Sequence, residues 1–175
     1  MPMRKKQHVI DVLVDEIDYS DREECSDAEQ LPSKAAIAEA VRTACEMAGY
    51  ADCDPELCIR FADDDAVRLL NQQWRHQDRV TDVLSFPMQE GPDFDWSEPL
   101  GDIALAMPFV LREARSLGLP LSDHCLHLII HACLHILGFD HIDDQQAIAM
   151  QRLEHQTMHK LGLHDPYPDL NEETP

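Results

Sequence analysis

The chain has 175 residues, with 34 Asp and Glu against 14 Lys and Arg, and a formal net charge of −20 at pH 7. This length suits one domain with a sizeable core and is short for two, so we expect residues 1–175 to form a single domain. The net charge excludes broad electrostatic attraction to nucleic acid or to an anionic membrane, but it permits a local basic groove.

Targeting and redox signals are weak in this sequence. No apolar run approaches the roughly 18 to 20 residues that cross a bilayer, and the acidic stretch after the first hydrophobic run is unlike a secretory signal. We therefore expect a cytoplasmic protein without membrane contact. The six cysteines never form a C-x-x-C pair, so their spacing favours buried reduced thiols over a disulfide framework or a thiolate zinc site.

The N-terminal part of the chain predicts a strand, a loop and a helix. Residues 8–14 form a short β-branched run that is typical of a strand. The acidic residues 15–31 contain few large apolar side chains, so we expect a solvated peripheral loop there. An apolar stripe that begins after Pro32 and Ser33 and stops at Gly49 predicts a helix.

The next segment predicts two strands with a helix between them. Residues 56–62 alternate as a half-buried strand does, and a helical pattern then extends to Trp74. The acids at 63–65 favour a helix cap over a metal cluster, because carboxylates are stabilised at a helix N-terminus. Residues 83–86 predict another strand, which ends at Pro87 because proline cannot continue a central ladder.

The remainder of the chain predicts one strand followed by three helices. The strand covers residues 100–106, and the helical patterns cover 108–116, 122–137 and 143–161. We expect the tail over about 165–175 to be peripheral, because its prolines keep it extended.

Three histidines at the end of the second of these helices have the spacing of a metal site. His131 and His135 lie one turn apart on one helix face, and Gly138 can take the left-handed conformation that reverses the chain and returns His141 to them. Three imidazoles form the open arrangement of a catalytic zinc site. An alternative set, His127, His131 and His135, also has a four-residue spacing. It spreads over about 12 Å of straight helix, which is too far for one tetrahedral ion.

A helical projection places four histidines on a narrow arc opposite a broad apolar side, and only Leu128 breaks the pattern. The arc consists of His124, His127, His131 and His135. His124 and His127 are then structural or orienting candidates, and we expect His127, Asp102 or Asp140 to orient a ligand histidine through a hydrogen bond.

Two arginines lie in a segment that is otherwise short of positive charge. Arg75 and Arg79 are candidates for binding a phosphate, since a guanidinium makes two parallel hydrogen bonds to a phosphate. The alternative is that they only neutralise Asp78 and Asp82 on the surface. In the histidine segment, Ala132 stands where a zinc protease has its glutamate base, which disfavours a metallopeptidase.

Several blocks of the sequence together resemble one family. The segment His131–His141 resembles the H-G-x-L-H-L-x-G-Y-D-H signature of the YbeY family of bacterial endoribonucleases and rRNA maturation factors. Arg75 with residues 81–87 (TDVLSFP), and residues 100–103 (LGDI), resemble two other blocks of that family, and the ending at 165–167 is similar too.

The resemblance covers roughly residues 55–167 and departs from the signature at two positions. Ala132 replaces a glycine, which is harmless because alanine is the better helix former. Phe139 replaces a tyrosine, which removes one hydroxyl near the histidines.

The resemblance implies an α+β fold with a small mixed sheet of about four strands packed against about five helices, with the metal site on a buried helix and the turn after it. It also implies one zinc ion on His131, His135 and His141, although three imidazoles suit nickel or iron as well. It further implies cleavage of single-stranded RNA in rRNA maturation and ribosome quality control, with His131 and Arg75 as catalytic residues and ribosomal proteins among its partners. With RNA as the substrate, Arg75 and Arg79 are the candidates for RNA binding. A rival hypothesis is a non-catalytic ribosome-assembly or rRNA-binding factor with a structural zinc.

Overall fold

A computed structural model describes residues 10–16 and 30–168 of the chain. Four strands form one mixed sheet in the order β1-β2-β4-β3. Strands β1, β2 and β4 are parallel, and β3 pairs antiparallel with β4 at one edge. The strands are β1 (Ile10–Val14), β2 (Leu57–Ala62), β3 (Val83–Pro87) and β4 (Gly101–Ala106).

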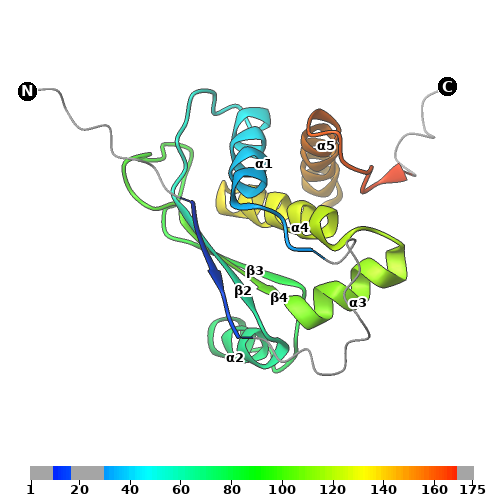
Figure 1. Cartoon of the computed structure of the whole chain (residues 1–175). Helices are drawn as coiled ribbons and strands as arrows, with labels where there is room; N and C mark the ends of the chain where they lie inside the picture. The colour runs from blue at the N-terminus through cyan, green and yellow to red at the C-terminus, as the bar shows by residue number, and fades with distance from the viewer. Residues whose placement is uncertain (1–9, 17–29, 169–175) are drawn as a thin grey trace, which may run out of the picture.

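Five helices complete the described fold, so the predicted α+β class is confirmed. They are α1 (Lys34–Met47), α2 (Asp64–Arg75), α3 (Met107–Leu117), α4 (Leu121–Ile136) and α5 (Asp144–Lys160). Helices α1 and α4 lie on one side of the sheet and α2 lies on the other (Figure 1). The predicted strand began at residue 8, and its first two residues lie outside the described part.

Three helices begin at side-chain caps, and the sequence predicts the one at residues 63–65. The backbone N–H of Ala36 donates to Ser33 Oγ over 3.1 Å, and that of Ala66 donates to Asp63 Oδ1 over 2.7 Å. At α5, Asp143 Oδ1 accepts from the N–H that lies three residues later, at 2.8 Å. Each side chain satisfies a backbone donor that has no partner within its helix. The 63–65 acids therefore begin a helix.

Helix α4 runs through the centre of the fold. Leu128 and Ala132, which face away from its most apolar side, are 5% and 1% exposed. The reason is that α1, α3, α5 and β3 all pack on α4, so it is enclosed on nearly every side. No single described helix is long and apolar enough to cross a bilayer, and only α3 and α4 taken together, bent by 114°, match such a span in length and composition.

The two segments that we expect to be peripheral are described only in part. Asp15 belongs to the sheet region, because its N–H donates to the carbonyl of Phe61 over 2.9 Å and its carboxylate pairs with Arg60 at 2.7 Å. The rest of the acidic segment, residues 17–29, lies outside the described residues. So do residues 169–175 of the tail, whereas Tyr167 packs against α5 through Glu154.

Candidate metal centre

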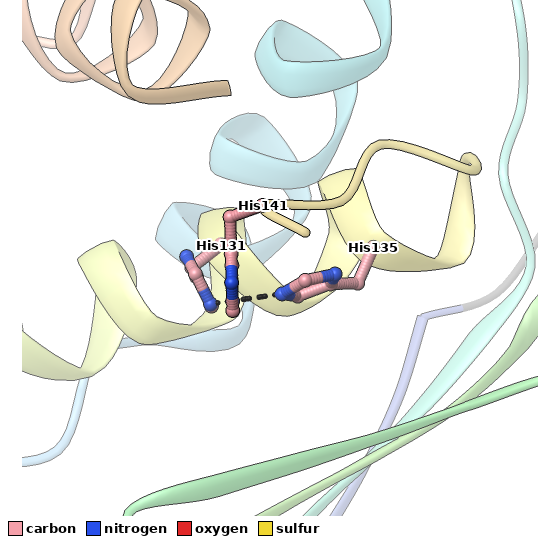
Figure 2. Close-up of side chains that lie close together, drawn as sticks. All are labelled: His131, His135 and His141. Carbon is pink, nitrogen blue, oxygen red and sulfur yellow. Dashed lines mark hydrogen bonds between the residues drawn. The ribbon is translucent and has the colours of Figure 1, made fainter. Parts of the chain in front are cut away.

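The histidine triad is formed by the end of α4 and the turn after it. His131 and His135 are one helical turn apart on α4. Gly138 then takes a φ of +95°, and the N–H of Phe139 donates to the carbonyl of Leu134 over 3.0 Å. This left-handed helix end reverses the chain, as the sequence predicts, and brings His141 over the other two rings (Figure 2).

The three imidazoles converge closely enough to share one ion. One ring nitrogen from each lies within 4.8 Å of the other two, and the Nε2 atoms of His131 and His135 are 3.1 Å apart. A tetrahedral zinc with bonds of 2.0–2.1 Å requires ligand nitrogens about 3.3 Å apart. Among the described residues, this is the only group of three or more His, Cys, Asp or Glu side chains whose candidate ligand atoms all lie within 4.8 Å of one another. The donor set therefore fits a metal ion.

The outer nitrogens of two rings are held by acceptors. His131 Nδ1 lies 2.6 Å from Glu154 Oε1, and His135 Nδ1 lies 3.0 Å from the carbonyl oxygen of Phe139. A carboxylate and a carbonyl can only accept, so each Nδ1 carries the proton and each Nε2 presents a lone pair to the shared point. Both rings are thus fixed in the tautomer that binds a metal.

Glu154, the hydrogen-bond partner of His131, is the site residue that sequence reasoning missed. Its side chain is 1% exposed, and it also accepts from His127 Nε2 at 2.8 Å and from the Tyr167 hydroxyl at 2.6 Å. A signal existed in the sequence, because Glu154 lies four residues from both Met150 and Met158, on the buried stripe of α5. A glutamate in such a stripe indicates a paired or hydrogen-bonded carboxylate.

The surroundings set the protonation of this network. Burial alone raises the pKa of Glu154, but hydrogen bonds and charge from His127 and His131 outweigh it and lower the pKa to about 2. Burial and repulsion from the neighbouring imidazoles lower the pKa of His135. Burial and the Glu154 carboxylate raise the pKa of Tyr167. At neutral pH, Glu154 is therefore ionised, His135 neutral and Tyr167 a phenol that donates.

The predicted orienting residues take other places. His127 contacts Glu154, so it acts on the triad only through that carboxylate. Asp140 Oδ1 is 4.0 Å from His135 Nδ1, beyond hydrogen-bond distance, and accepts instead from the backbone N–H of His141 at 2.8 Å. Asp102 makes no hydrogen bond to the triad in the described chain, because its position on β4 puts it on the far face of the sheet.

His124 plays no part in the triad. It is 5% exposed, and its Nε2 lies 3.1 Å from a carboxylate oxygen of Glu113 on α3. This pair belongs to the packing of α3 on α4.

The triad opens into a cavity of about 200 Å³ that also contains Arg75. Arg75 is the last residue of α2, and its Nη2 donates to the carbonyl oxygen of Ser85 on β3 over 3.5 Å. The other lining residues are Thr81, Asp82, Val83, Ser85 and Ala132. The structure thus brings the arginine and the TDVLSFP segment to the same cavity as the three histidines.

Arg79 is not part of this cavity. Its side chain is exposed and donates to Gln77 Oε1 over 3.0 Å, and it does not line the cavity. Neither arginine neutralises the nearby acids, because Asp78 pairs with Arg68 at 2.7 Å. Asp82 accepts from the N–H of Val83 at 2.7 Å. Arg75 is therefore the guanidinium available to a ligand beside the triad.

Comparison with known proteins identifies relatives of this chain. The family model described as Endoribonuclease YbeY matches residues 18–162. A protein of Stutzerimonas stutzeri with that name is 46% identical over 121 residues, which cover 69% of this chain and 76% of that protein. One of Rhizorhabdus wittichii is 48% identical over 119 residues, covering 64% and 70%.

A solved structure supports the fold alone. The solution structure of a Thermotoga maritima protein matches with a TM-score of 0.52 and 20% sequence identity. The match covers 95% of this chain and 100% of that one.

Proposed function

This chain belongs to the YbeY family of endoribonucleases, and from that premise we propose that it is a zinc-dependent endoribonuclease that cleaves single-stranded RNA. We place this activity in the cytoplasm, in rRNA maturation and ribosome quality control, with ribosomal RNA as substrate and ribosomal or assembly proteins as partners. The observation that carries the proposal is one cavity that contains three convergent imidazoles and the Arg75 guanidinium.

His131, His135 and His141 would hold the metal through three ring nitrogens. Three protein ligands leave one position open, which is the arrangement of catalytic rather than structural zinc sites. A bound zinc supplies a Lewis acid and a water whose pKa is lowered to about 7. Nickel or iron would also fit three imidazoles, so the choice of zinc is part of the proposal.

Arg75 supplies the phosphate contact. No carboxylate of the described residues lies within 4.0 Å of its guanidinium, so the donors that do not bond to the Ser85 carbonyl can meet an anionic ligand. A guanidinium binds two phosphate oxygens in parallel and opposes the negative charge that develops when the phosphodiester is attacked. We therefore assign catalytic roles to Arg75 and His131.

A non-catalytic assembly factor with a structural zinc is the second candidate, and the net charge of −20 favours it, since binding proteins needs no basic surface. The open triad weighs against it. The side chains of His131 and His135 are 25% and 23% exposed, and His141 is exposed, whereas structural zinc is enclosed by four ligands. A metallopeptidase remains disfavoured because Ala132 provides no base.

The test treats four proteins with zinc in the same way, measures the zinc that each retains, and compares their cleavage of a labelled single-stranded RNA. We expect His131→Ala to lose both bound zinc and cleavage. Arg75→Glu should keep its zinc but lose about 100-fold or more in cleavage rate, the usual cost of removing a charge-stabilising donor. Arg42→Glu makes the same charge change at an exposed position on α1 outside the cavity and should cleave like wild type. Equal background cleavage by all four proteins would refute the nuclease proposal.

A further inference from the structure

The sheet has a second face that α2 covers only in part. The cross-strand register places Cys58, Asp102 and Phe86 in one row across β2, β4 and β3, and Arg60 and Ala104 in the next. These side chains point away from α1 and α4, because alternate residues of a strand face opposite sides.

Helix α2 covers one end of this face and leaves the other end open. At the covered end, Val67 of α2 packs on Ala62, Leu84 and Ala106. The open end forms a groove of about 670 Å³, within the usual range for ligand sites. The groove is therefore a built feature of the sheet, with α2 as its wall.

The wall of the groove carries an exposed aromatic side chain. Trp74 on the last turn of α2 is 68% exposed, and its ring meets Phe86 on β3 edge to face, with centroids 6.3 Å apart. Leu13 and Met88, which also line the groove, are 54% and 58% exposed. Large apolar side chains gathered in one exposed place indicate a binding surface.

The groove and the triad cavity meet at the edge strand β3. Arg75 and Ser85 line both of them. Because Arg75 comes from α2 on one side of β3 and reaches the Ser85 carbonyl, its guanidinium stands between the apolar groove and the three histidines. A ligand held by Arg75 at its anionic part can place a flat apolar part in the groove.

We propose that this groove is a subsite for a nucleobase of single-stranded RNA, which stacks on Trp74 while Arg75 holds a neighbouring phosphate at the mouth of the triad cavity. The proposal rests on the endoribonuclease function proposed above and names where its substrate lies. Open sheet faces with exposed aromatic rings are a common way to bind unpaired bases, because every base offers a flat face to stack. Stacking adds affinity without a positive surface, which suits a chain of net charge −20.

The first experiment follows Trp74 itself. The chain has two tryptophans, and the half-buried Trp96 packs on Tyr50 and Phe94, so Trp96→Phe leaves Trp74 as the reporter. Zinc-loaded Trp96→Phe protein is mixed rapidly with a single-stranded RNA and with the same RNA lacking its bases. We expect quenching of Trp74 by the first RNA and none by the second, before any cleavage occurs.

The second experiment measures cleavage by Trp74→Ala, Trp74→Phe and Leu69→Ala. Trp74→Ala should raise KM about 5- to 150-fold and leave kcat nearly unchanged, as expected for the loss of one stacked base. Trp74→Phe should recover most of this loss. Leu69→Ala is the matched control, because Leu69 is 62% exposed on the same helix but does not line the groove.

The outcomes separate the two proposals. Cleavage by wild type with no quenching, and an unchanged KM in Trp74→Ala, would overturn the base subsite and leave the nuclease intact. Base-dependent quenching without cleavage would refute the nuclease and keep the subsite. If wild type is a dimer in solution and Trp74→Ala is a monomer, the groove is an interface between copies and the RNA subsite is wrong.

Discussion

Replacing Glu154 tests whether a buried carboxylate on α5 prepares the triad to bind a metal ion. The carboxylate is 1% exposed and takes hydrogen bonds from three groups, of which His131 alone belongs to the triad. Glu154→Gln keeps an oxygen that can accept from His131 but removes the charge. Glu154→Ala removes both, and the ring of His131 is then free to rotate or change tautomer.

The structure sets the size of each effect. Loss of a hydrogen-bonded partner behind a metal ligand lowers metal affinity by about 10- to 100-fold. We expect Glu154→Gln near the lower end, because orientation is retained, and Glu154→Ala near the upper end. Glu154→Ala also leaves three donors without a buried acceptor, which costs roughly 3 to 5 kcal/mol in the free energy of unfolding. Tyr167→Phe removes only one of the three donors and should cost about 1 kcal/mol.

The assay is zinc affinity, measured by competition with a chromophoric chelator, together with urea unfolding of the chelator-treated proteins. Glu113→Gln is the matched control, since Glu113 pairs with His124 on α4 but touches no residue of the triad. It should bind zinc like wild type. Zinc affinities of both Glu154 variants within twofold of the Glu113→Gln value would refute the idea that Glu154 fixes His131.

Three further predictions concern the framework. Gly101→Ala should lower the free energy of unfolding by about 1 to 3 kcal/mol in urea titrations, because the new Cβ would lie 2.4 Å from the carbonyl oxygen of Phe86, a backbone atom that cannot rotate away. Asp63→Ala should cost about 1 kcal/mol in the same measurement by removing the cap of α2, whereas Asp63→Asn should cost little. Burial, aided by the charge of His127, lowers the pKa of His164 in the folded state, so protonation opposes folding and stability falls as the pH drops below about 6.5. His164→Asn should therefore lose less stability than wild type between about pH 7.5 and pH 5.5, and equal losses would contradict this assignment.

Features that depend on neighbours in sequence could be predicted, and features that depend on packing could not. The His131–His135 pair follows from helical spacing, and the place of His141 follows from Gly138, so local geometry alone assembles the triad. Glu154 reaches His131 only because α5 packs on α4, 23 residues away in sequence. No local pattern states which helices become neighbours. Sequence reasoning therefore predicted Asp140 or Asp102 as the carboxylate that orients a histidine, although Glu154 takes that role.

The position of Asp102 along β4 explains why it does not reach the triad. In the register of β4 with β3, Asp102 pairs with Phe86 while Ile103 pairs with Ser85. Because side chains alternate, Ile103 faces α4 and Asp102 faces the opposite side of the sheet. The sequence shows this alternation but does not state on which face the histidine helix packs. That choice depends on which face the other helices cover.

The net charge of the chain says little about the charge around the triad cavity. Several described carboxylates are committed to local structure: Asp63 caps α2, Asp15 pairs with Arg60, and Asp78 pairs with Arg68. The triad cavity holds three imidazoles, one guanidinium and a single carboxylate, Asp82. Asp82 already accepts hydrogen bonds from Thr81 and from the backbone of Val83. A phosphate in that cavity would therefore meet the Arg75 guanidinium and any metal ion held by the three imidazoles, and at physiological salt the more distant acidic surface is screened over about 8 Å.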